Sequence, residues 1–139
     1  EEPVRAVETA IVNGISFVAQ AFSGDVKHMT KIFAEAISHK GFALINAFSP
    51  CVTFNKVNTY EWFKDGLINV DEMEGYDPTD RQAALDIMHE NAGMVYGVIY
   101  KNPRPVFHEE MLGASDTAAA KMDLHIPLAQ KRELLATFS

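Results

Sequence analysis

A strand–helix–strand pattern over residues 15–48 constrains the fold more than any other feature of the sequence. Residues 15–21 are β-branched, aromatic and other apolar side chains with glycines close by on both sides, which predicts a buried strand. A helix with Asp25 as its N-cap is expected next, and residues 42–48 predict a second buried strand. Because such crossovers are right-handed, the two strands should run parallel in one sheet. The apolar stripe of the intervening helix comprises Met29, Ile32, Phe33, Ala36 and Ile37.

Helices are also predicted on both sides of this unit. One spans residues 3–13, with Pro3 in its first turn, and a short one spans residues 59–67. Another should have Asp77 as its cap and Pro78 at its first position, and should end near residues 91–93.

A third strand is expected over residues 94–100, and a last helix near residues 128–138. The predicted fold class is therefore α/β, with a partial, mostly parallel sheet and flanking helices. We expect residues 1–112 to form this α/β domain and residues 113–139 to form a linker and a C-terminal helix.

Three strands make a thin sheet, and the chain does not begin with Met. We expect either that further strands precede Glu1 in a longer parent chain, or that the chain forms an oligomer through the free edge of its sheet.

The composition excludes several classes of protein. With 139 residues, 47% hydrophobic and 22% charged, the chain is typical of one globular domain, and its single Cys cannot form an internal disulfide. No stretch approaches the roughly 18 to 20 apolar residues of a membrane span. A net charge of -7 disfavours nucleic-acid binding, which needs a basic face. We expect a soluble, cytoplasmic protein with small-molecule or protein partners.

Cys51 is the candidate functional residue. It follows the predicted strand over residues 42–48, and the carboxyl ends of parallel strands are where α/β proteins place their binding sites. A thiol there suits a nucleophile or a metal ligand, although a buried inert Cys fits the pattern as well. The five histidines occur singly along the chain, so no pair has the spacing of a closed zinc site. Phosphate-binding glycine motifs are also missing.

Four segments carry a resemblance to a known family. They are residues 14–25 (GISFVAQAFSGD), 49–55 (SPCVTFN), 58–63 (NTYEWF) and 77–81 (DPTDR). Together they closely resemble the C-terminal half of the beta subunit of 2-oxoacid:ferredoxin oxidoreductases, over about the first 110 residues. The resemblance is most specific in the second and third segments.

This resemblance implies an enzyme that oxidatively decarboxylates a 2-oxoacid to an acyl-CoA and passes electrons to ferredoxin. Its cofactors are thiamine diphosphate, Mg²⁺ and a [4Fe-4S] cluster, and its partners include an alpha subunit, ferredoxin and coenzyme A. Three cluster cysteines of the family lie in the N-terminal half, and the fourth maps onto Cys51, which makes Cys51 the expected cofactor-binding and metal-ligating residue. No residue of this chain is expected to be catalytic.

The chain also departs from the family pattern. It has no Cys-x-x-Cys and no Gly-Asp-Gly segment for the magnesium diphosphate, so we expect no cofactor to bind this fragment and no activity from it alone. Residues 53–55 resemble the 2-oxoglutarate branch more than the pyruvate branch. Two alternatives stay open: a non-catalytic α/β subunit-interaction module with Cys51 in its core, and a Cys-dependent hydrolase, which needs a His within reach of Cys51.

Overall fold

The computed structural model describes residues 3–110, 121 and 125–137, and the chain divides into two compact units, Glu1–Val106 and Phe107–Ser139. The described residues of the second unit include the helices α5 (Phe107–Glu110) and α6 (Leu128–Ala136). Helix α6 confirms the predicted last helix, and none of its residues is buried. Most of the linker expected from residue 113 lies outside the described residues.

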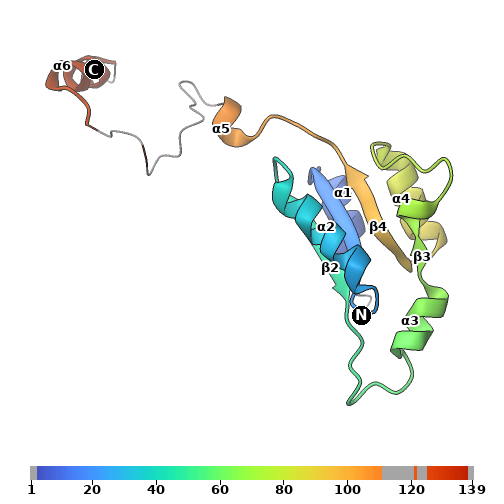
Figure 1. Cartoon of the computed structure of the whole chain (residues 1–139). Coiled ribbons are helices and arrows are strands. Elements are labelled where there is room, and N and C mark those ends of the chain that lie inside the picture. Colours follow the sequence, from blue (N-terminus) through green and yellow to red (C-terminus); the bar gives the residue numbers. More distant parts are fainter. Residues whose placement is uncertain (1–2, 111–120, 122–124, 138–139) are drawn as a thin grey trace. The chain divides into compact units, whose positions relative to one another are not determined.

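The predicted strand–helix–strand unit is present in the first unit (Figure 1). Strand β1 (Phe17–Phe22), helix α2 (Val26–Ser38) and strand β2 (Ala43–Phe48) follow one another, and β1 and β2 pair in parallel along their whole lengths. Asp25 caps α2, since its side chain accepts a hydrogen bond from the backbone N–H of His28 at 3.0 Å. The apolar strand patterns and the Asp25 cap that predicted this unit therefore agree with the observed fold.

Within the part of the chain that the structure describes, the sheet has four strands in the order β2-β1-β4-β3. The predicted third strand is β4 (Val95–Lys101), and it runs antiparallel to β1. The two-residue strand β3 (Ile68–Asn69) pairs in parallel with β4 and leads into the 3-10 helix η1 (Val70–Glu72). The α/β class is confirmed, with a mixed sheet in which two of the three strand pairings are parallel.

Strand β1 is the centre of the core, and all six of its residues are buried. Val18 faces a cluster built with helices α1 (Ala6–Val12) and α4 (Arg81–Glu90), which lie side by side. Phe17, Ala19 and Ala21 face a second cluster, with Ile32 and Ala36 of α2. Helices therefore cover both faces of the sheet.

Two predicted helix starts were wrong. Asp80, and not Asp77, caps α4, because its carboxylate accepts from the backbone N–H groups of Gln82 and Ala83. Asp77 forms a turn of its own, in which the backbone and hydroxyl of Thr79 both donate to it at 2.8 Å. Helix α1 begins at Ala6, so Pro3 lies before its first turn.

A polar side chain joins the three long strands at the core. Gln20 of β1 is 2% exposed, and its Nε2 donates to the carbonyls of Val95 at 2.7 Å and Gly93 at 2.9 Å. Its Oε1 accepts from Asn46 Nδ2 of β2 at 2.6 Å. All of these groups are thereby hydrogen-bonded, as buried polar groups need to be. Over the described part of the chain, no helix is long and apolar enough to span a membrane.

Candidate functional site

Cys51 lies at the carboxyl end of β2, as the sequence predicted. Ser49 and Pro50 separate it from the strand, and its side chain is exposed. Because β1 and β2 are parallel, their last residues, Phe22 and Phe48, lie side by side. The loop that contains Cys51 begins directly after this end of β2. The thiol is therefore held at the rim of the sheet and open to a partner.

The backbone of the loop after Cys51 affects the acidity of the thiol. Hydrogen bonds from the backbone N–H groups of Phe54, Thr53 and Asn55 hold the pKa of the Cys51 thiol below its ordinary value. Such donors stabilise a thiolate, which is the form that binds metal. The arrangement suits Cys51 as a ligand.

Asn55 fixes the shape of this loop. Its backbone N–H donates to the Cys51 carbonyl at 3.2 Å, and its Oδ1 accepts from the backbone N–H groups of Val57 and Asn58, each at 3.0 Å. Asn55 is half-buried, whereas the residues from Cys51 to Phe54 are exposed. The sequence pattern did not indicate this role for Asn55, although Asn is a common turn-forming residue.

Aromatic packing anchors the far end of the loop. Helix α3 (Tyr60–Gly66) begins where the sequence predicted, with Thr59 as its cap. The ring of Phe63 lies 5.3 Å from that of Phe48 and 6.0 Å from that of Phe22, and Tyr60 lies 5.8 Å from Phe22. The aromatic cluster therefore ties α3 to the ends of β1 and β2.

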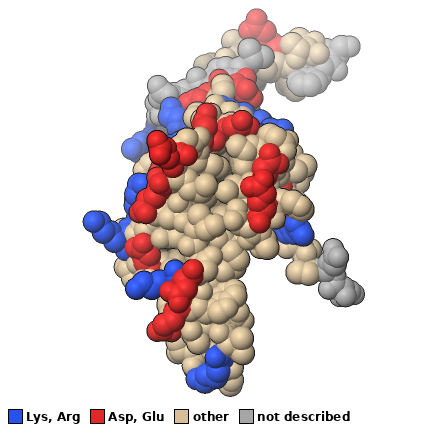
Figure 2. All heavy atoms as spheres, turned by 90° about the vertical axis from the view of Figure 1, so that its right-hand side faces the viewer, with Lys and Arg blue, Asp and Glu red and all other residues tan. Residues whose placement is uncertain are grey.

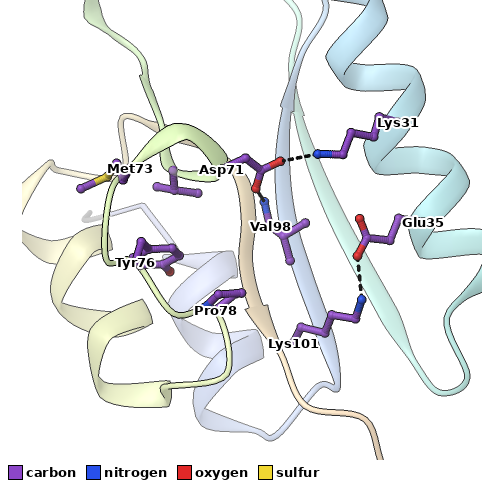
Figure 3. A pocket seen from close by; sticks show the side chains of 9 residues that line it. Lys31, Glu35, Asp71, Met73, Tyr76, Pro78, Val98 and Lys101 are labelled. Carbon is purple, nitrogen blue, oxygen red and sulfur yellow. Dashed lines mark hydrogen bonds and ion pairs between the residues drawn. The ribbon is translucent and has the colours of Figure 1, made fainter.

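A second site is a pocket of about 310 Å³ between α2, η1 and β4 (Figure 3). Two ion pairs lie across it: Lys31 to Asp71 at 3.5 Å and Lys101 to Glu35 at 2.7 Å. Its remaining polar group is the hydroxyl of Tyr76, which donates to the carbonyl of Ile99 at 2.6 Å.

Burial, with smaller contributions from Asp71, Asp77 and Asp80, raises the pKa of Tyr76 to about 12, so this hydroxyl stays protonated. The charged and polar groups of the pocket are thus engaged with one another or with the backbone. The pocket is better explained as part of the packing of η1 against α2 and β4 than as a reaction site.

Two histidines are also engaged away from Cys51. His28 Nε2 lies 3.0 Å from Asp71 Oδ2, and His39 Nε2 lies 2.9 Å from Ser16 Oγ. No group of three or more His, Cys, Asp or Glu that could hold a metal ion occurs among the described residues. Within that part of the chain, Cys51 can therefore supply one ligand of a metal centre but cannot complete one.

Comparison with known proteins places these features in a family. Residues 51–116 match the model for the C-terminal part of the pyruvate ferredoxin oxidoreductase beta subunit. The chain is 32% identical over 127 residues to a 2-oxoacid:ferredoxin oxidoreductase subunit beta of Sulfolobus sp, and 37% identical over 119 residues to one of Saccharolobus solfataricus. These alignments cover 84% and 78% of this chain, but 42% and 39% of the relatives.

A solved structure agrees with this assignment. The fold is similar to a 2-oxoglutarate:ferredoxin oxidoreductase from Magnetococcus marinus with 2-oxoglutarate, coenzyme A and succinyl-CoA bound, with a TM-score of 0.73 and 27% identity. The match covers 100% of this chain and 46% of that one. The chain thus spans less than half the length of the proteins that it resembles, and it belongs with the beta subunits of 2-oxoacid:ferredoxin oxidoreductases.

Proposed function

We propose that the chain works as part of a 2-oxoacid:ferredoxin oxidoreductase. This enzyme converts a 2-oxoacid and the thiol of coenzyme A to an acyl-CoA, carbon dioxide and a proton, with two electrons passing to ferredoxin. The observation that carries this proposal is the position of Cys51. Its thiol is exposed and lies three residues after the end of β2, the strand that pairs in parallel with β1. It also belongs to residues 49–55, one of the segments that carry the family resemblance. The alpha subunit and ferredoxin are the partners that this function requires.

In this proposal Cys51 is one thiolate ligand of a [4Fe-4S] cluster. The donor set fits, because cluster irons take thiolate ligands and backbone N–H groups directed at the sulfur stabilise its negative charge. The sequence has a single Cys, and its described residues hold no group of metal ligands, so the other three ligands must come from other polypeptide. The role of this chain is to hold one ligand at a fixed place on the rim of its sheet.

The residues of this chain do not fit thiamine diphosphate and Mg²⁺. The sequence has no Gly-Asp-Gly segment, and the described residues hold no cluster of carboxylates for the metal. We therefore assign no step of the carbon chemistry to this chain, and we propose that it is inactive by itself. The cofactor and Mg²⁺ belong to other parts of the enzyme.

We propose 2-oxoglutarate as the substrate. Thr53, Phe54 and Asn55 resemble the 2-oxoglutarate branch, and the similar Magnetococcus marinus structure is named for that oxoacid. The family model that matches carries the name of the pyruvate enzyme, so the two substrates need a direct comparison.

The exposure of Cys51 also weighs against the two alternatives. A non-catalytic interaction module would place Cys51 among apolar side chains, whereas the thiol is exposed. A Cys-dependent hydrolase needs a general base beside the thiol, whereas His28 and His39 interact with Asp71 and Ser16 instead.

The experiment is an activity assay of the chain with and without the other subunit, the remaining beta-subunit segments and the cofactors. The chain is combined with an alpha subunit and with a polypeptide that carries the Cys-x-x-Cys and Gly-Asp-Gly segments of such a beta subunit, and is supplied with iron, sulfide, thiamine diphosphate and Mg²⁺. We expect coenzyme-A-dependent reduction of a viologen dye only from the complete mixture, and faster with 2-oxoglutarate than with pyruvate. Turnover by the chain alone, or equal turnover when the chain is omitted, contradicts the proposal.

A further inference from the structure

Asn55 closes the loop between β2 and α3 on both of its sides. Its backbone N–H donates to the carbonyl of Cys51 at 3.2 Å, which closes the chain before Asn55. Its side-chain Oδ1 accepts from the backbone N–H groups of Val57 and Asn58, each at 3.0 Å, which closes the chain after it. One half-buried residue therefore joins the two halves of the loop.

The backbone bond acts directly on the residue that carries the thiol. It joins two residues that are four positions apart, so residues 52–54 form a closed turn between them. The carbonyl in this bond is that of Cys51, and it is attached to the same Cα as the thiol side chain. A rotation about the Cα–C bond of Cys51, which turns the sulfur relative to the turn, therefore breaks the bond to Asn55.

The side-chain bonds of Asn55 connect this turn to a helix that is packed on the sheet. An Asn side chain that accepts from the N–H two residues further on forms an Asx turn, and the bond from Asn58 extends it by one residue. Asn58 directly precedes Thr59, the cap of α3. Because the ring of Phe63 anchors α3 on the ends of β1 and β2, the position of Cys51 is linked through Asn55 to the sheet itself.

We propose that Asn55 is a positioning residue for the cluster ligand Cys51, and that it raises the reduction potential of the cluster by holding the loop in this shape. The inference rests on the proposed function, in which Cys51 ligates a [4Fe-4S] cluster. Asn55 supplies no ligand in this role and acts through the loop backbone.

The effect on the potential follows from the charge on the ligand sulfur. Reduction adds an electron, so N–H groups that donate to a ligand sulfur stabilise the reduced state more than the oxidised state. The lowered pKa of the Cys51 thiol indicates that the backbone N–H groups of Phe54, Thr53 and Asn55 are such donors. When the loop loses its shape these donors are lost, and the reduction potential becomes more negative.

Charged side chains offer little else in this segment to set the potential. Residues 41–55 contain no charged side chain. The loop between β2 and α3 forms the lower end of the first unit in Figure 1, and Figure 2 shows mostly uncharged surface at that end. Asn55→Ala leaves the net charge unchanged, so a shift of the potential in this variant reports the loop geometry and not a change of charge.

Asn69 provides a matched control. Its Oδ1 accepts from the backbone N–H of Asp71 at 3.1 Å, two residues further on, at the start of η1. Strand β3, which ends at Asn69, lies at the opposite edge of the described sheet from β2 (Figure 1). Asn69→Ala therefore removes a turn bond of the same kind away from Cys51 and measures the effect of a general loss of stability.

The first test measures the reduction potential of the cluster in the assembled enzyme, by electron paramagnetic resonance during a redox titration. Asn55→Ala should lower the equilibrium constant for reduction about threefold or more, a shift of about 30 mV to more negative potential for a one-electron couple. Asn69→Ala should keep the potential of the parent enzyme. An unchanged potential in Asn55→Ala, or an equal shift in Asn69→Ala, overturns the proposal.

The second test measures how fast the assembled enzyme releases iron to a chelator. Asn55→Ala should release iron about threefold faster or more, and Asn55→Asp, which keeps the side-chain acceptor for Val57 and Asn58, should restore the rate of the parent enzyme. A rate for Asn55→Asp as fast as that for Asn55→Ala overturns the role of the acceptor. If Asn55→Ala retains no cluster, Asn55→Ser takes its place in both tests, because a Ser hydroxyl forms a weaker turn of the same kind.

Cys51→Ser separates this inference from the proposed function. A Cys51→Ser enzyme with the iron content and cluster signal of the parent enzyme contradicts the proposed function. If Cys51→Ser loses both, while Asn55→Ala keeps the potential and the iron-release rate of the parent enzyme, only the role of Asn55 is overturned.

Discussion

The carboxylate of Asp71 accepts a hydrogen bond of 2.8 Å from the backbone N–H of Val98, at a bulge in the sheet. Val18 pairs with Tyr100 and Ala19 with Val98, so β4 has one residue more than β1 at this point and its ladder is interrupted. The side chain of Asp71 supplies the acceptor that Val98 would otherwise lack. It also contacts Lys31 at 3.5 Å, and so joins η1 to both β4 and α2 (Figure 3).

Replacing Asp71 with Ala should lower the free energy of unfolding by about 1.5 to 3 kcal/mol, since a hydrogen bond to a charged group is lost and a backbone N–H is left without its acceptor. Glu72→Ala is the matched control, because Glu72 lies next to Asp71 in η1 and is exposed. Urea unfolding measures the free energy of unfolding of both variants. An equal effect of the two substitutions would show that the Asp71 to Val98 bond adds no stability.

Gln20→Leu should cost about 2 to 3 kcal/mol, because it removes the donor to two carbonyls and the acceptor for Asn46 at a buried position. Gln82→Ala, which breaks an exposed hydrogen bond to Asp86 within α4, should change the stability by no more than about 0.5 kcal/mol. Thermal unfolding of both variants checks the difference. If Gln20→Leu is as stable as the parent, the network does not stabilise the sheet.

The stability should fall as the pH falls below 6.5, in part because of His39. Burial lowers the pKa of His39, Lys101 lowers it further and Glu35 opposes them. The unfolded chain therefore binds a proton in a pH range where the folded chain does not, and the contribution of His39, complete above 6.5, is lost as the pH drops toward the folded pKa. Urea midpoints from pH 8 to pH 5 should fall less steeply for His39→Gln. Parallel curves would contradict this.

The thiol of Cys51 should react at lower pH in the folded chain than in the unfolded one, because backbone N–H groups stabilise its thiolate. The rate of alkylation by iodoacetamide is measured against pH, with and without urea, and the chain has a single Cys. Asn55→Ala should move the folded profile back toward the unfolded one, since Asn55 fixes the loop. Identical profiles for the parent chain in both states would refute the assigned loop geometry.

Local patterns predicted the parts of the fold that local interactions determine. In the β1, α2, β2 unit, two apolar strand segments flank an amphipathic helix segment, and Asp25 caps the helix. Each of these local signals predicts the element that the structure shows. Strand β3 was missed because two residues carry no periodicity, and its pairing with β4 depends on distant contacts. The start of α4 was misplaced because Asp77 and Asp80 are both good caps, and only the structure shows that Asp77 binds Thr79.

The candidate site was predicted in part for the same reason. The place of Cys51 follows from strand direction, which the βαβ rule fixes from sequence. The backbone donors around its sulfur and the role of Asn55 depend on the exact turn that the chain takes, which residue types alone leave open. Asp71 was missed as a joining residue because its partners, Lys31 and Val98, are 40 and 27 residues away in the sequence.

The central claim is that Cys51 ligates an iron–sulfur cluster, and its most direct test is electron paramagnetic resonance of the assembled, dithionite-reduced enzyme that contains this chain. Cys51→Ser should lose most of the cluster signal and lower the iron content, whereas Ser49→Ala, two residues away on the same loop, should retain both. A Cys51→Ser enzyme with unchanged iron content and an unaltered cluster signal would contradict the account.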